Sequence, residues 1–111
     1  METQLSAGEK QFLLGIARTT MENAVMGKQR PQPDPGSIPE GCRRDGASFV
    51  TLTVEGELRG CIGTLEAYQP LYIDVQEHAV QAALEDHRFP PVSREELPLI
   101  SIEISRLTTP V

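Results

Sequence analysis

Between residues 47 and 65, apolar and polar side chains alternate with the period of two that is typical of a β-strand. Glu55 and Gly56 interrupt this pattern, and glycine readily adopts the positive φ that a tight hairpin turn requires. The pattern therefore predicts two antiparallel strands, 47–54 and 57–65, joined by a two-residue turn. A chain built around such a hairpin must form a sheet and cover at least one face of it with other elements.

The second predicted strand has the most unusual composition in the chain. Residues 58–64 read LRGCIGT, with Gly60 and Gly63 on either side of Cys61. Glycine within a strand gives up side-chain packing and backbone entropy, so this pair indicates that another group approaches the backbone closely. Packing alone does not explain the stretch.

The alternation places Arg59, Cys61 and Gly63 on one face of the strand. A guanidinium close to a thiol stabilises the thiolate, which makes Cys61 a candidate nucleophile, redox centre or metal ligand, with Arg59 tuning it. The alternative is that Cys61 is a small buried apolar residue, as free cysteines often are. The spacing leaves both interpretations open.

Two helices are expected from the spacing of apolar residues. Residues 5–26 show the three- and four-residue recurrence of an amphipathic helix, and Ser6 with Glu9 fits a capping box at its start. Residues 70–86 form a second such segment, with His78 on or beside its apolar stripe. A histidine at that place is more often a core residue than a ligand.

A third strand is predicted at residues 99–107, where three isoleucines alternate with polar residues. Before it, Ser93 and Glu96 fit a second capping box. Together these elements predict one α+β domain over residues 1–111, with a mainly antiparallel sheet and two packed helices. An exposed sheet edge or apolar patch is expected, which a partner or self-association would cover.

A proline-rich segment, residues 27–46, separates the first helix from the hairpin. Its four prolines fix φ and remove amide donors, so the segment is expected to be a surface loop or flap. Long ordered loops are often functional, whereas a mobile linker is the alternative. Cys42 lies in this segment and is interpreted as incidental.

The charge and composition exclude several classes of function. The net charge is −6, with no cluster of lysine and arginine, which argues against binding to nucleic acid. No apolar run is long enough to span a membrane and no signal pattern opens the chain, so a cytoplasmic protein with reduced thiols is expected. The two cysteines and two histidines lack the spacing of a metal site, and no cofactor motif is present.

Several motifs, in order, resemble the AMMECR-type domain family. They are LRGCIGTL at residues 58–65, FVTL at 49–52, DHRFPPV at 86–92, EL at 96–97 and IEIS at 102–105. The family includes protein A of the AmmeMemoRadiSam system. The resemblance implies the same α+β fold, and because family members continue beyond Val111, it implies a domain that lacks its C-terminal part. For prokaryotic members it also implies Memo-like and radical-SAM proteins as partners, but it implies no settled reaction.

Two functions fit these residues. The first is a module that binds a small ligand or a protein partner through the LRGCIGT surface, and the second is a cysteine-dependent enzyme with Cys61 as its reactive group and Arg59 beside it. The candidate ligand-binding residues are Gly60, Gly63, Thr64, Asp86, Arg88 and Glu103.

Some of these candidates have a structural alternative. For Asp86 and Arg88 it is an ion pair that holds a loop. Glu103 is expected to bond Arg59 if their strands are neighbours. His87 has the ordinary chemistry of a general base, although no spacing links it to Cys61.

Overall fold

The computed structural model describes residues 2–3 and 5–107. Its strands are β1 (Glu2–Thr3), β2 (Ala47–Val54), β3 (Glu57–Gly63) and β4 (Ile100–Leu107). Its α-helices are α1 (Ala7–Val25), α2 (Glu40–Arg43) and α3 (Leu71–Leu84), with short 3-10 helices at Pro35–Ser37 and Arg94–Leu99. None of the described helices combines the length with the hydrophobicity that a membrane-spanning helix needs.

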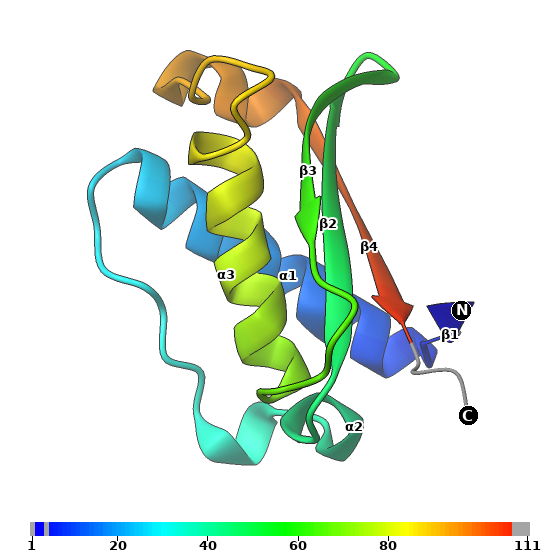
Figure 1. Ribbon diagram of the computed structural model, residues 1–111. Coiled ribbons are helices and arrows are strands. Elements are labelled where there is room, and N and C mark those ends of the chain that lie inside the picture. Colours follow the sequence, from blue (N-terminus) through cyan, green and yellow to red (C-terminus); the bar gives the residue numbers. More distant parts are fainter. Residues whose placement is uncertain (1, 4, 108–111) are drawn as a thin grey trace.

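The strands form one antiparallel sheet in the order β1-β4-β2-β3. The hairpin turns where predicted, with φ of 52° at Glu55 and 82° at Gly56. The helices α1 and α3 lie on one face of the sheet, and the other face carries no helix among the described residues (Figure 1). The predicted α+β class, with two helices packed on a mainly antiparallel sheet, is confirmed.

The core lies between the sheet and the two helices α1 and α3. The predicted apolar stripe of α3 is buried, including Leu71, Val75 and Ala79, and it packs with Val50 and Leu52 of β2. Residues two apart in a strand share a face, so Val50 and Leu52 identify the inner face of the sheet. Their odd-numbered neighbours project from the outer face.

The hairpin contains one irregularity that alternation did not predict. Leu52 is opposite Gly60, whereas Thr53 is opposite Leu58, so Arg59 is an extra residue with no partner on β2. Such a β-bulge bends the strand and redirects the side chain of the extra residue. Arg59 therefore does not follow the simple period of two.

Both predicted capping boxes are present. The Ser6 amide donates to Glu9 at 3.0 Å and the Glu9 amide donates to the Ser6 hydroxyl at 3.2 Å, so α1 begins close to its predicted start. The second box joins Ser93 and Glu96. The first helix ends before Gly27, because the φ of 73° at this glycine lies outside the range of a right-handed helix.

The proline-rich segment runs along the side of α3 that faces away from the sheet (Figure 1). It is tied to the core more closely than a surface loop, because Ile38 and Cys42 are buried and Gln76 of α3 donates to the Pro31 carbonyl at 2.9 Å. Cys42 is fully buried, and burial, with the nearby Glu9 carboxylate, raises the pKa of its thiol to about 11. Both cysteines are free thiols.

Candidate functional site

Two rows of side chains cross the outer face of the sheet. Thr51 lies opposite Cys61 on β3 and Glu103 on β4, and Phe49 lies opposite Gly63 and Ser105 in the next row. Residues paired across antiparallel strands project from the same face. We call these six residues the Cys61 surface. Glu103 is exposed and the other five are partly exposed.

Cys61 occupies the end of one row, on the strand at the edge of the sheet. Its sulfur lies 3.2 Å from the Thr51 hydroxyl. The thiol is partly exposed, in contrast to the fully buried Cys42. The interpretation of Cys61 as a small buried apolar residue is therefore wrong.

Asp86 and Arg88 close the free edge of β3 beside Cys61. The Cys61 amide donates to the Asp86 carboxylate at 3.0 Å, and the Arg88 guanidinium donates to the Cys61 carbonyl at 3.4 Å. The two side chains also bond each other, at 2.7 Å and 3.0 Å. Satisfying the backbone groups of an edge strand blocks the pairing of another strand there. The expected exposed edge is therefore covered at Cys61 by the chain itself.

The charges of this pair are strongly coupled. The hydrogen bonds from Arg88 and from the Cys61 amide hold the pKa of Asp86 well below its usual range, and Asp86 in turn raises the pKa of Arg88. Asp86 is buried, whereas the Arg88 side chain is 57% exposed and its guanidinium lies 5.4 Å from the centre of the Phe89 ring. An exposed guanidinium, paired with Asp86, thus lies at the edge of the sheet beside Cys61.

Arg59 is held by Glu96 and not by Glu103. Its Nε and a terminal nitrogen donate to the two Glu96 oxygens at 2.9 Å and 3.0 Å. The condition for an Arg59–Glu103 bond is not met, because β4 pairs with β2 and is not adjacent to β3. The bond from Arg59 lowers the pKa of Glu96 to about 2 and Glu96 raises the pKa of Arg59. The Arg59 guanidinium is therefore already neutralised.

The two glycines are explained by packing within the chain. A Cβ at Gly60 would lie 2.1 Å from the Ala82 carbonyl oxygen, so α3 rests directly on the β3 backbone. A Cβ at Gly63 would lie 2.4 Å from the ring of Phe49 and 2.5 Å from the Ser48 carbonyl oxygen. The groups that approach the backbone are thus a helix and an aromatic ring of the same domain. Gly60 is buried and offers no surface to a ligand.

His78 belongs to a buried polar cluster on the inner face. The Ser48 hydroxyl donates to Asp74 at 2.7 Å, and the His78 Nδ1 lies 3.2 Å from both Ser48 Oγ and Asp74 Oδ2. All three side chains are almost fully buried. Burial tends to raise the pKa of Asp74, but the bonds from His78, Gln69 and Ser48 outweigh it and hold the pKa below its usual value.

This cluster contains the residue types of a hydrolytic triad without its geometry. Ser48 and Asp74 both contact the same imidazole nitrogen of His78. In a hydrolytic triad the serine and the aspartate contact opposite nitrogens of the histidine, and the serine hydroxyl is accessible to substrate. Ser48 and Thr51 project from opposite faces of β2, so His78 is also separated from Cys61 by the sheet. The cluster is therefore a hydrogen-bonded polar group within the core and not a catalytic triad. The spacing of Asp74 and His78, four residues apart on one helix, is the signal that sequence reasoning missed.

The remaining candidates lie at the margins of the Cys61 surface. His87 is exposed and Thr64 is partly exposed, with the Thr64 amide donating to the Ser48 carbonyl at 3.2 Å. Within residues 2–3 and 5–107, no three side chains of the metal-binding types gather into a group that fits an ion.

Known proteins are similar to this chain in sequence, and one solved structure is similar in fold. The AMMECR1 family model matches residues 14–111. A protein of Methanothermobacter thermautotrophicus is 42% identical over 106 residues, which are 96% of this chain and 55% of the relative. A protein of Thermotoga maritima is 39% identical over 105 residues, which are 93% of this chain and 60% of the relative.

A solved structure agrees with these sequence relatives. It is described as the crystal structure of uncharacterized protein PH0010 from Pyrococcus horikoshii, and it superposes with a TM-score of 0.86 at 30% identity, covering 94% of this chain and 53% of that one. The chain thus spans about half the length of the relatives it matches.

Proposed function

The chain belongs to the AMMECR1 family, and from this premise we propose that it is a binding module that holds a protein partner against the Cys61 surface. The observation that supports this most is the composition of the outer sheet face. It presents a phenylalanine, small polar side chains and a thiol on a face that no helix covers among the described residues (Figure 1). Aromatic residues surrounded by polar ones are typical of the centres of protein interfaces.

The charges at the two ends of this surface add specificity to the proposal. Glu103 is exposed on β4, and the exposed Arg88 guanidinium lies beyond the edge of β3. A partner with a basic group opposite Glu103 and an acidic group opposite Arg88 would match both ends. Such complementarity fixes the orientation of a complex more than it adds affinity.

The resemblance to protein A of the AmmeMemoRadiSam system supplies candidate partners. We propose the Memo-like protein and the radical-SAM protein of that system as the first proteins to test. Thr64 and the Asp86–Arg88 pair are included in the proposed contact surface, because Thr64 directly follows β3 and the pair lies beside Cys61 at the free edge of that strand.

A cysteine-dependent enzyme is the second candidate, favoured by the partly exposed thiol and the nearby Arg88 guanidinium. Nucleophilic catalysis needs a base or an available cation beside the thiol. Arg59 is committed to Glu96, and Arg88 is bonded to Asp86. His78 lies across the sheet with Ser48 and Asp74. The set of groups beside Cys61 therefore supports binding better than turnover.

Titration calorimetry with the two candidate partners tests the proposal. We expect one of them to bind, and Thr51→Arg, which places a long cation in the middle of the Cys61 surface, to weaken binding about tenfold or more. Gln11→Arg is the matched control, since it adds the same side chain at an exposed position of α1. Both variants are first shown to keep the unfolding midpoint of the wild type.

The same assay separates the two functions. Cys61→Ser is expected to keep binding within a few-fold, because serine preserves the shape of the surface. If neither protein binds, or if Thr51→Arg and Gln11→Arg bind equally well, the proposed contact surface is wrong. Turnover of a substrate that Cys61→Ser abolishes would favour the enzyme instead.

A further inference from the structure

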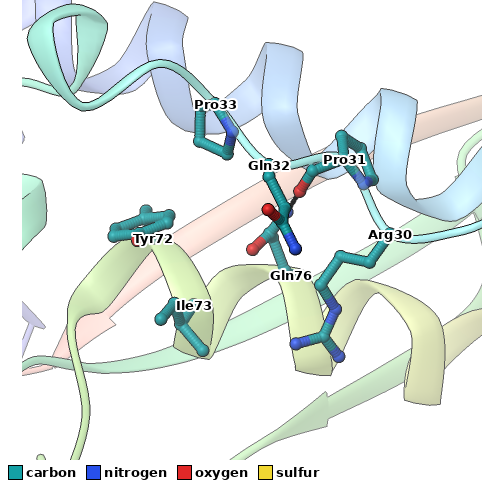
Figure 2. A pocket seen from close by; sticks show the side chains of 7 residues that line it. All are labelled: Arg30, Pro31, Gln32, Pro33, Tyr72, Ile73 and Gln76. Carbon is teal, nitrogen blue, oxygen red and sulfur yellow. Dashed lines mark hydrogen bonds between the residues drawn. The ribbon is translucent and has the colours of Figure 1, made fainter.

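A cavity of about 340 Å³ lies between the proline-rich segment and α3, on the side of the helix that faces away from the sheet (Figures 1 and 2). Tyr72, Ile73 and Gln76 of α3 form one wall, and residues 30–33 form the other. Its size is at the lower end of the range for small-molecule sites. It shares no residue with the Cys61 surface, so it is independent of the function proposed above.

Gln76 gives this cavity a fixed hydrogen-bond acceptor. Its side-chain nitrogen donates to the Pro31 carbonyl at 2.9 Å and to the Thr20 hydroxyl at 3.2 Å. A carbonyl only accepts hydrogen bonds, so the orientation of the amide is determined and both of its N–H groups are used. The amide oxygen is therefore the part of Gln76 that remains for another molecule.

The position of that oxygen points to a ligand. Gln76 is only 2% exposed, and no fully buried side-chain oxygen among the described residues lacks a hydrogen-bond partner. No group among the described residues donates to the Gln76 oxygen, so this oxygen keeps some accessible surface, and Gln76 is one of the residues that line the cavity. An accessible acceptor that is held in one orientation can take a hydrogen bond from a molecule bound in the cavity.

Arg30 and the apolar groups complete the arrangement. Figure 2 shows Arg30 at one end of the cavity beside Gln76, and Tyr72 at the other end below Pro33. Arg30 is exposed and has no ion-pair partner among the residues described, so its guanidinium is available to an anion. The cavity thus offers a cation, then an acceptor, then a surface of ring and aliphatic groups.

We propose that this cavity binds an aromatic 2-hydroxycarboxylate. The carboxylate of such a molecule pairs with Arg30, its hydroxyl donates to the free oxygen of Gln76, and its ring lies against Tyr72, Ile73 and Pro33. The order of groups along the molecule, acid then hydroxyl then ring, is the order of their partners along the cavity.

Phenyllactate is the probe that tests this site. It is titrated into the folded domain, and its binding is measured from changes in the amide chemical shifts. We expect saturable shifts at Arg30, Gln32 and the amides of residues 72–76, with a dissociation constant in the millimolar range. Two matched compounds test the two polar contacts separately. The first, 3-phenylpropanoate, lacks the hydroxyl, and the second, 3-phenylpropane-1,2-diol, lacks the charge of the carboxylate. Each is expected to bind about tenfold more weakly than phenyllactate, because each loses one hydrogen bond to the cavity that nothing replaces.

A variant tests the role of the cation. Arg30→Gln is expected to weaken phenyllactate about tenfold and to leave the diol unchanged, whereas Arg43→Gln, at an exposed arginine of α2, changes neither. Arg30 makes no hydrogen bond within the described residues, so Arg30→Gln is expected to fold normally. The proposal is overturned if phenyllactate produces no shifts, if the shifts lie outside the cavity, or if 3-phenylpropanoate binds equally well.

Discussion

The Asp86 carboxylate accepts a hydrogen bond from the Cys61 amide at 3.0 Å, across the free edge of β3. Asp86 is itself held by Arg88, so a turn after α3 closes the strand that carries the thiol. This contact joins the segment at residues 86–92 to the one at residues 58–65. The two motifs meet at one backbone amide and one backbone carbonyl.

Removing the carboxylate is expected to open this edge. In Asp86→Ala the Cys61 amide loses its acceptor. Its hydrogen exchange is expected to accelerate by about an order of magnitude, because that factor corresponds to the free energy that one hydrogen bond contributes. Amide exchange measured residue by residue checks this. Exchange of the Val50 amide, on the central strand β2, serves as the control. Unchanged exchange at Cys61 would contradict the role of Asp86.

The Arg59–Glu96 pair predicts a pH-dependent part of the stability. The folded pKa of Glu96 is about 2, below its ordinary value of 4.5, so the pair stabilises the fold fully above pH 4.5 and the effect is lost as the pH falls towards 2. Glu96→Gln is expected to lower the free energy of unfolding by about 1 kcal/mol at neutral pH, because glutamine keeps the capping box but not the ion pair.

Urea unfolding of wild type and Glu96→Gln across this pH range measures the effect. The difference between the two proteins should shrink as the pH falls. Glu95→Gln, at the exposed neighbouring position, is the control and should show almost no difference at any pH. A difference that does not depend on pH would show that the ion pair is not its source.

The close contact of α3 with Gly60 predicts a large cost for one methyl group. Gly60→Ala would place Cβ against the backbone of Ala82, which no side-chain rotation can relieve, so we expect a loss of about 2 kcal/mol in the free energy of unfolding. Gly15→Ala is the control: it lies in α1 with open space around it and should stabilise the domain by about 0.5–1 kcal/mol. Equal effects of the two variants would be inconsistent with this packing.

The two thiols are expected to differ sharply in reactivity. Cys61 is partly exposed, whereas Cys42 is fully buried with a pKa of about 11. In the folded domain, iodoacetamide should therefore alkylate Cys61 and leave Cys42 intact at neutral pH, and both should react after unfolding in urea. Mass spectrometry of the peptides distinguishes the sites. Alkylation of Cys42 at the same rate would mean that the segment around it opens readily.

Much of the fold follows from local patterns. The hairpin turn, both capping boxes and the buried stripe of α3 were readable because each depends on residues close in sequence. The buried positions of Ile38 and Cys42 were not, because they depend on the distant α3. The two-residue strand β1 is too short to show any period.

The site was predicted less well than the fold. The composition of residues 58–64 correctly indicated close approach to the backbone, but it did not show that the approaching groups were Ala82 and Phe49. The partner of Arg59 depends on strand order, which alternation does not reveal. The bulge at Arg59 was missed for a related reason, since it appears only in the register between two strands.

The central claim is that a protein partner covers the Cys61 surface, and protection of one thiol tests it most directly. The rate at which iodoacetamide alkylates Cys61 is measured with and without a saturating amount of the partner that binds in calorimetry, and Cys61→Ser provides the blank. We predict that the bound partner slows alkylation of Cys61 at least about tenfold, because an interface core excludes water and reagent. Alkylation at an unchanged rate in the saturated complex would contradict the claim.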